Sequence, residues 1–171
     1  MGNIIDSLID RTADWLRYAE AKNAALVAYA GVLIGLFGDN DSKCKLWVFL
    51  GILLTSIGLG IALISFLPKT NSHFKSQSDL ENLNEETFNL FAWPDLAKAT
   101  PSFVLDYVKK NINSSVYQGG LTKEALLTQI DQLIILAQIT ETKNSKFICA
   151  LVFCMLGTLA FLINIAVTLF S

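Results

Sequence analysis

Residues 46–68 read LWVFLGILLTSIGLGIALISFLP and contain no charged side chain. A helix needs about 20 apolar residues, within a range of roughly 17–25, to cross the hydrocarbon core of a bilayer. Two further uncharged stretches, residues 23–38 and residues 147–171, lie on either side of it in the chain. The sequence therefore predicts three transmembrane helices. The stretch 23–38 is the shortest of them, and a re-entrant hairpin is the alternative there.

The composition of the whole chain agrees with a membrane protein. The 171 residues are 53% hydrophobic and 16% charged, whereas soluble domains carry about 25% charged residues. The net charge of −2 excludes a strongly basic nucleic-acid binder as the simple interpretation. With His73 as the single histidine, the chain offers neither a metal-binding triad nor a Ser-His-Asp catalyst. We therefore expect no catalytic residue, no metal and no cofactor.

Helical periodicity extends the first and last spans beyond the membrane. Apolar residues recur at helical spacing before residue 23, and no proline interrupts residues 123–170. We expect an all-α membrane protein with long continuous first and last helices and a small helical cytoplasmic module. The expected division is 1–67 for the amphipathic helix and transmembrane hairpin, with spans at about 23–38 and 46–67, then 68–146 for the module and 147–171 for the third span.

The distribution of basic residues predicts the orientation. Seven lysines and arginines flank the spans on one side: Arg11, Arg17, Lys22, Lys69, Lys75, Lys143 and Lys146. The short 38–45 loop carries two lysines, offset by two aspartates. Because cytoplasmic flanks are enriched in basic residues, we expect a multi-pass protein of the cell membrane with the N-terminus and residues 68–146 in the cytoplasm.

Local signals predict the elements of the module. A helix is expected over 79–91, although residues 88–93 are also compatible with a short strand. Thr100 as N-cap and Pro101 at the first position indicate a helix that runs to about Asn111. Thr122 is expected to cap the long last helix. A heptad row on that helix leads into the third span: Leu126, Ile130, Leu133, Ala137, Thr140, Asn144 and Phe147.

Each span carries a stripe of small or polar residues. The stripes are Ala24, Ala28, Gly31 and Gly35 in the first span, Gly51, Thr55, Gly58, Ala62 and Ser65 in the second, and Ala150, Cys154, Gly157, Asn164 and Thr168 in the third. Small residues allow helices to approach closely in lipid. The stripes are therefore compatible with helix packing or with one wall of a water-filled pathway.

Five positions are candidate pore or gate residues. Glu20 and Asn23 stand at the cytoplasmic mouth of the first span, where a ring of glutamates in an oligomer would favour cations. Asn164 is the strongly polar side chain of the third span, and it fits helix contacts or pore lining. Phe161 and Thr168 share its stripe, and Phe161 is the candidate gate.

Lysines beside aromatic residues in the module suggest a ligand site. The candidates are Trp93, Lys98, Tyr107, Lys109 and Lys110. Cations beside aromatic rings can hold a phosphate and stack a base. Lysines at a helix end are also compatible with an ordinary solvated surface.

Three segments of the chain resemble the transmembrane effectors of Pycsar antiphage defence. Residues 13–26, ADWLRYAEAKNAAL, resemble the family's first helix, in which an acidic residue and a lysine precede a small-residue span. Residues 89–98, NLFAWPDLAK, resemble its mid-chain segment, and residues 127–147 resemble the helix before its last span. Residues 144–147, NSKF, depart from the Lys-Tyr pattern that members often carry there. The resemblance supplies no ligand-contacting residue.

This resemblance implies a signal-sensing module and a nucleotide-gated effector that forms a pore or disrupts the bacterial inner membrane to arrest infected cells. The ligand would be a cyclic nucleotide, or a short oligonucleotide as in the related-looking Hailong channels. A partner cyclase or nucleotidyltransferase would make it. We expect a homo-oligomer in the lipid bilayer, with a tetrameric ring as the first candidate. A non-channel membrane scaffold that recruits a protein partner is the alternative.

Overall fold

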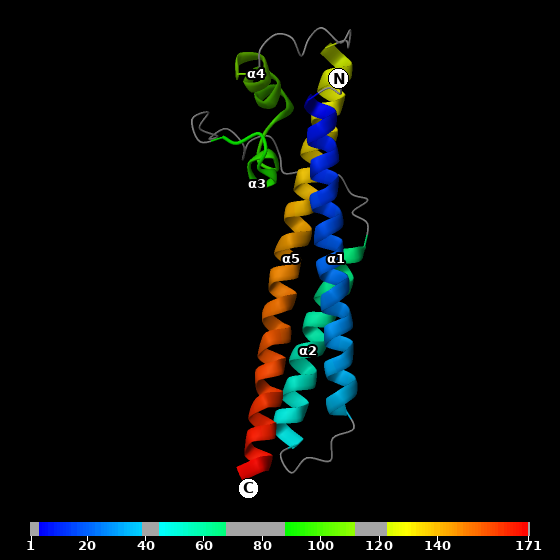
Figure 1. The fold of residues 1–171 in the computed structure, drawn as a ribbon, viewed down its shortest axis with the longest axis vertical. Coiled ribbons are helices and arrows are strands. Elements are labelled where there is room, and N and C mark those ends of the chain that lie inside the picture. The colour runs from blue at the N-terminus through cyan, green and yellow to red at the C-terminus, as the bar shows by residue number, and fades with distance from the viewer. Residues whose placement is uncertain (1–3, 39–44, 68–87, 112–122, 171) are drawn as a thin grey trace. The chain divides into compact units, whose positions relative to one another are not determined.

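The computed structural model of the chain describes residues 4–38, 45–67, 88–111 and 123–170. These residues form five helices: α1 (Ile4–Gly38), α2 (Lys45–Phe66), α3 (Trp93–Leu96), α4 (Pro101–Asn111) and α5 (Lys123–Phe170) (Figure 1). The described ranges contain no strand. The all-α fold predicted from the sequence is confirmed for them, as are the long first and last helices.

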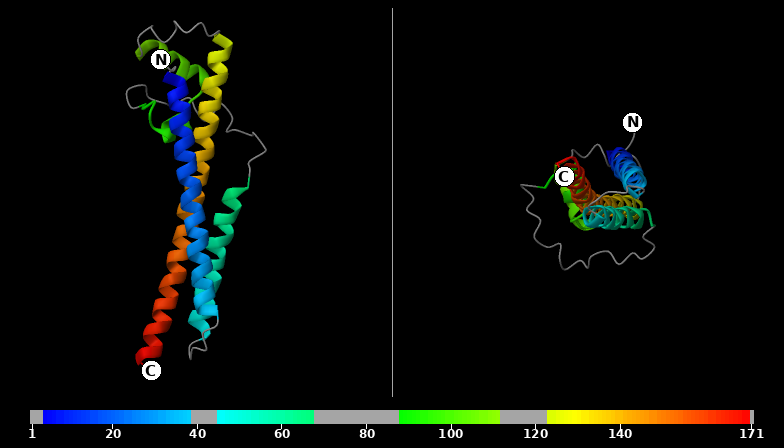
Figure 2. Two further views of the ribbon diagram at one scale, coloured as in Figure 1. Left: turned by 45° about the vertical axis from the view of Figure 1, so that its right-hand side comes forward. Right: turned by 90° about the horizontal axis from the view of Figure 1, so that it is seen from below.

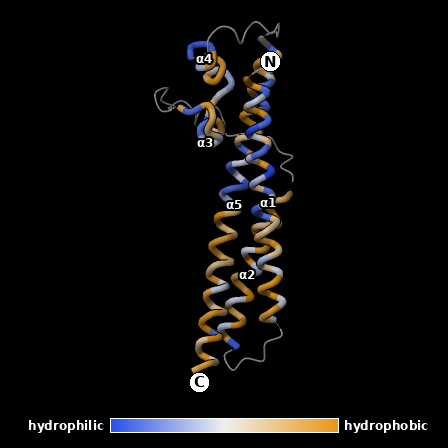
Figure 3. The backbone as a smooth tube through the Cα atoms, viewed as in Figure 1, coloured by the Kyte–Doolittle hydropathy of each residue, from blue (hydrophilic) through white to orange (hydrophobic). Residues whose placement is uncertain are grey.

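Three of these helices are long and apolar enough to cross a membrane. The candidate spans are Ile4–Gly38, Lys45–Phe66 and Glu124–Phe170. Figure 3 shows α2 as mainly apolar along its length, and the C-terminal parts of α1 and α5 as more apolar than their N-terminal parts. The predicted spans lie inside these helices, except for residue 171 and residue 67, which follows α2. The three-span membrane fold is thus confirmed.

The chain divides into two compact units, and each unit combines distant parts of the sequence. The charged unit contains Met1–Tyr18 and Lys69–Thr142, and it holds most of the charged residues. The membrane unit contains Ala19–Pro68 and Lys143–Ser171. Helices α1 and α5 each contribute to both units. The division predicted from the sequence follows chain order instead, and it stays a prediction.

An apolar core in which α1, α4 and α5 take part holds the charged unit together. Its contributors include Ile5 and Leu8 of α1 and Val104 and Val108 of α4. The first five positions of the predicted heptad row on α5 are buried, and the last two are half-buried. Each fully buried aliphatic side chain of this kind contributes about 1.5–3 kcal/mol relative to exposure. The first four positions of the row therefore mark the face of α5 that closes this core, whereas Phe147 packs against the apolar cluster of the membrane unit.

Helix α4 begins where the sequence predicts. The backbone N–H of Phe103 donates to the Thr100 side-chain oxygen at 3.2 Å, and Pro101 occupies the first helical position. Such a cap satisfies one of the backbone donors that a helix start leaves without a partner. The helix ends at Asn111, as expected. Thr122, the expected cap of α5, lies outside the described residues.

The helix expected over 79–91 is wrong for residues 88–91, and so is the alternative strand over 88–93. The Asn89 side-chain oxygen accepts from the Phe91 N–H at 2.9 Å, and the Asn89 N–H donates to Asp95 Oδ2 at 3.1 Å. An asparagine that bonds its own backbone in this way favours a turn over a helix. Trp93 then begins the short α3, with Pro94 in its first turn. Residues 79–87 lie outside the described ranges.

In the membrane unit, α2 runs antiparallel to α1 and α5, and the three helices lie side by side (Figure 2). The buried residues of α2 are Val48, Gly51, Thr55, Gly58, Ala62 and Ser65. This set contains the entire small-residue stripe predicted for the second span. The stripe therefore faces the interior of the unit.

Candidate functional site

The small-residue stripes of the second and third spans pack against each other. A Cβ atom added at Gly58 would lie 2.7 Å from the Cys154 sulfur and 2.8 Å from the Ala150 carbonyl oxygen. At Gly157, an added Cβ would collide with Thr55 and lie 3.0 Å from the Gly51 carbonyl oxygen. We call this contact the α2–α5 seam, and it comprises Gly51, Thr55, Gly58, Ala150, Cys154, Gly157 and Phe161. Glycine is required here because the two backbones approach so closely.

The stripe of the first span is arranged differently. Ala24, Ala28, Gly31 and Gly35 are exposed, and we call them the α1 stripe. A Cβ added at Gly31 or Gly35 would meet no atom within 4 Å. Three stripes that look alike in the sequence thus form one closed contact and one open surface.

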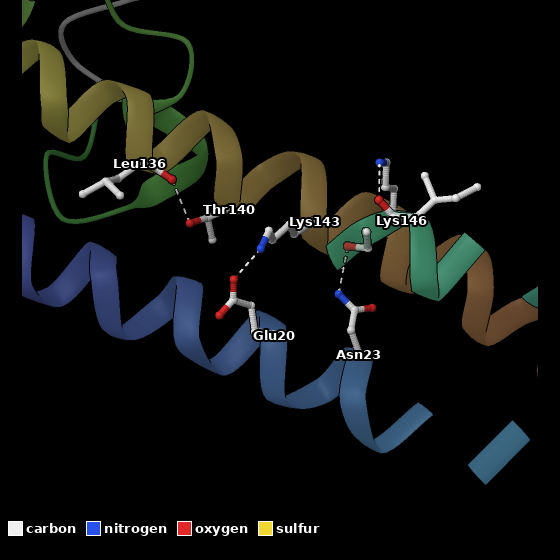
Figure 4. Close-up of polar contacts among 8 residues, drawn as sticks. Glu20, Asn23, Leu136, Thr140, Lys143 and Lys146 are labelled. Atoms are coloured by element: carbon white, nitrogen blue, oxygen red, sulfur yellow. Dashed lines mark hydrogen bonds and ion pairs between the residues drawn. The ribbon is translucent and has the colours of Figure 1, made fainter. Parts of the chain in front are cut away.

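Polar residues from all three helices gather at one end of the membrane unit (Figure 4). Glu20 of α1 forms an ion pair with Lys143 of α5. One helical turn further along α1, the Asn23 side-chain nitrogen donates to the Ser65 hydroxyl of α2 at 3.0 Å. We call Glu20, Asn23, Ser65 and Lys143 the polar cluster.

Two lysines beside the polar cluster add further links between the helices. The Lys22 ammonium lies 5.5 Å from the centre of the Phe147 ring, which joins α1 to α5. The Lys146 ammonium donates to the Ile64 carbonyl oxygen of α2 at 3.4 Å. Basic side chains with long aliphatic stems can pack on apolar surface while the charge reaches polar groups. This end of the unit therefore combines apolar packing with polar contacts.

The Glu20–Lys143 pair sets the electrostatics of this end. The Lys143 side chain is 15% exposed and the Glu20 side chain is 45% exposed. Because each charge is compensated within the chain, Glu20 does not present the free negative charge that a cation-selective ring requires. Lys143 is the more buried member, so removal of Glu20 would leave a mostly buried ammonium without compensation, which is destabilising.

Two amide oxygens are buried in the membrane unit without a hydrogen-bond partner among the described residues. They belong to Asn23 and Asn164, each of which is 1% exposed. A buried polar atom without a partner costs about 1–3 kcal/mol. Such a group in a membrane helix is a candidate functional site. Both residues were predicted as pore or gate positions, and both lie in the interior of a single chain.

The other predicted gate residues differ in their surroundings. Phe161 is buried in the α2–α5 seam beside Gly51, and its ring stacks on Phe37 of α1 with the ring centres 4.2 Å apart. Thr168 is exposed, and its hydroxyl donates to the Asn164 carbonyl oxygen at 2.8 Å. Phe161 therefore joins all three helices, whereas Thr168 bonds within its own helix. Their role in a pore stays a prediction.

Among the predicted ligand residues of the charged unit, Trp93 begins α3, Lys98 follows α3, and the other three lie on α4. Trp93 and Tyr107 pack against the apolar core, and the Tyr107 hydroxyl donates to the Phe88 carbonyl oxygen at 3.3 Å. Lys98 is exposed just after α3. Lys109 and Lys110 occupy the last turn of α4, where the negative end of the helix dipole favours cations. The two aromatic rings thus serve packing, while the lysines lie at the surface. Their role in ligand binding stays a prediction.

Sequence reasoning did not find two contacts that join distant parts of the chain. One is the pairing of Glu20 with Lys143. The other is the guanidinium of Arg11, whose carbon lies 5.8 Å from the centre of the Phe91 ring. Helical periodicity places Arg11 on the polar face of α1. No local signal connects it to a ring after the second span.

The helical fold, with helices that are long and apolar enough to cross a bilayer, defines an all-α membrane protein with three candidate spans. The family model described as the Pycsar effector protein domain matches residues 4–170, and the chain belongs to that family. It is therefore a membrane effector of antiphage defence, as its resemblance to these effectors indicated. No curated protein and no solved structure gives a significant match.

Proposed function

We propose that the chain is a homo-oligomeric, nucleotide-gated and non-enzymatic effector that forms a pore or disrupts the inner membrane to arrest infected cells. The signal is a cyclic nucleotide or a short oligonucleotide, made by a partner cyclase or nucleotidyltransferase. The charged unit faces the cytoplasm and binds this signal. Membership of the effector family supports the defence role.

One observation carries the proposal: the buried amide oxygens of Asn23 and Asn164 have no partner within the described residues. In a helix bundle built only for stability, apolar residues would pack at these positions without that cost. A state in which water reaches the two amides would satisfy them. We infer that the packed arrangement is the closed state and that opening hydrates this interior.

The contacts around these amides suggest how opening proceeds. Separation of Lys143 from Glu20 would expose a negative charge at the mouth of the first span in every subunit, and such a ring favours cations. The stacked rings of Phe37 and Phe161 form an apolar layer, and apolar constrictions close pores by dewetting. The ligand drives this change only through a higher affinity for the open state.

Exposed small and apolar residues on the membrane unit support oligomerisation. The α1 stripe is open, and large side chains of α5 such as Met155 and Leu159 are exposed. Close packing of small residues is the usual basis of helix association in lipid. We propose a closed ring of identical chains, with a tetramer as the first candidate to test.

The test is ion flux from liposomes that contain the purified full-length protein. Flux is expected on addition of cyclic CMP, cyclic UMP or a short DNA oligomer, or on removal of the oligomer if it holds the channel closed. Asn164→Leu should abolish flux without loss of assembly, while Leu162→Met, an exposed neighbour, should conduct as the wild type does. Absence of flux with every probe would contradict the channel and favour a scaffold that recruits a protein.

A further inference from the structure

Hydrogen bonds fix the backbone at Phe91, and its ring is half exposed to solvent. Its side chain is 50% exposed, whereas Phe88 is buried in the core of the charged unit. The Phe91 N–H donates to the Asn89 side-chain oxygen at 2.9 Å, and the Ala92 N–H donates to the Asn89 carbonyl oxygen at 3.0 Å. The turn thus directs an apolar ring outward, where it gains little from burial.

A cation from another part of the chain accompanies this ring. The Arg11 guanidinium carbon of α1 lies 5.8 Å from the ring centre, within the range of a cation–π contact. Arg11 is exposed and forms no ion pair with any described carboxylate. Arg17, six residues further along α1, instead pairs with Asp14 at 3.1 Å. No described carboxylate therefore compensates the charge of Arg11, and an anionic ligand can bind it.

The Arg11 guanidinium and the Phe91 ring can each bind a different part of one ligand. A guanidinium presents a rigid fork of N–H donors that matches two phosphate oxygens, and its plane also stacks on aromatic surfaces. An exposed phenyl ring stacks with any planar base. A lipid headgroup carries the phosphate without the planar ring. A nucleotide carries both, so it engages both side chains at once.

We propose that Arg11 and Phe91 form a nucleotide-binding site on the charged unit, in which the base stacks at Phe91 and a phosphate binds Arg11. The inference rests on the proposed function, because it assigns the place where the signal binds. It differs from the site predicted around Trp93, Lys98, Tyr107, Lys109 and Lys110, whose two rings pack against the core. The chemistry fits a cyclic mononucleotide and an oligonucleotide alike.

The experiment measures binding of cyclic CMP, cyclic UMP and a short single-stranded DNA oligomer to the full-length protein in neutral-lipid nanodiscs by calorimetry. Arg11→Ala and Phe91→Leu should each weaken binding of the recognised probe about tenfold or more. Phe91→Tyr keeps the ring and should bind within about twofold of the wild type. Arg17→Ala and Trp15→Leu, which remove an exposed arginine and an exposed aromatic of the same unit, are the matched controls and should bind as the wild type does.

The outcomes separate this site from the proposed function. If the wild type binds a probe and the Arg11 and Phe91 variants, with unchanged melting temperatures, bind it equally well, the site is wrong while nucleotide sensing stands. Loss of binding only on exchange of Lys98, Lys109 and Lys110 for glutamine would also overturn it. If inorganic phosphate competes for the site as strongly as the nucleotide itself does, the base does not stack at Phe91 and the proposal is wrong. If the wild type binds none of the probes, nucleotide sensing itself fails.

Discussion

The α2–α5 seam and the α1 stripe use the same kinds of residue and reach opposite outcomes. In the seam, the glycines lie so close to the opposing helix that an added methyl group at Gly58 would collide with it. In the α1 stripe, Gly31 and Gly35 border open space. Small residues therefore permit close contact between helices, but they do not decide which helix supplies the contact.

The seam also contains the large ring that its glycines accommodate. Phe161 fills the space above Gly51 and stacks on Phe37. The open face carries a polar link instead: the Tyr29 hydroxyl lies 2.7 Å from the Thr158 hydroxyl, beside an apolar groove of about 620 Å³. Since Thr158 donates to the Cys154 carbonyl oxygen, Tyr29 is the donor. The seam is a contact between closely packed backbones, whereas the Tyr29–Thr158 hydrogen bond joins two side chains beside a groove.

The largest effect is expected at the centre of the seam. Phe161→Ala removes the buried ring and should lower the free energy of unfolding by about 3–5 kcal/mol. Leu36→Ala, on the exposed side of α1, should change it by less than about 0.5 kcal/mol. Denaturation of the two variants in mixed micelles measures both values. Similar losses would mean that the open face is as tightly packed as the seam.

A matched pair of glycine substitutions should change stability in opposite directions. Gly58→Ala places a methyl group against Cys154 and should cost about 1–3 kcal/mol. Gly31→Ala adds the same methyl group to open space and should stabilise helix α1 by up to about 1 kcal/mol. Thermal unfolding in detergent compares them. If Gly31→Ala instead alters the oligomeric mass, the α1 stripe is covered by a second chain.

Substitution of Asn164 should raise stability while it abolishes ion flux. Asn164→Leu keeps a similar shape and removes the amide oxygen that lacks a partner, so the free energy of unfolding should rise by about 1–3 kcal/mol. The same substitution at Asn23 also removes the bond to Ser65, and its gain should be smaller. Micelle denaturation gives both values. A loss of stability at position 164 would show that the amide is satisfied in the native protein.

The smallest effect is expected on the open face. Thr158→Val removes the partner of the Tyr29 hydroxyl and should cost about 0.6 kcal/mol, the average for hydrogen bonds between membrane helices. Tyr29→Phe should cost the same amount, and the double variant should cost little more. A double-mutant cycle by thermal unfolding measures the coupling. Additive losses would exclude an energetic link between the two hydroxyls.

Features with local signals could be predicted from the sequence. The three spans follow from apolar length, the start of α4 follows from Thr100 and Pro101, and the extent of α5 follows from the absence of proline. The turn at residues 88–91 could not be predicted, because it depends on the hydrogen bond from the Asn89 N–H to the Asp95 side chain in α3. A single asparagine in an apolar run does not reveal which partner it will find.

Contacts between distant residues were the least predictable part of the candidate sites. The sequence singled out Glu20 and Asn23, but it gave no indication that Lys143 and Ser65 would be their partners. It also gave no indication that the Arg11 guanidinium would lie beside the Phe91 ring. Helical periodicity fixes the face on which a residue lies. Packing of the whole chain determines what that face meets.

The discontinuous composition of the two units has a consequence for synthesis. Both units need α1 and α5, and α1 precedes α5 by more than 80 residues in the chain. Until residues 143–170 emerge from the ribosome, the glycine face of α2 lacks the helix that closes it. A nascent or truncated chain therefore completes neither unit. Assembly of both units therefore requires translation to continue through α5.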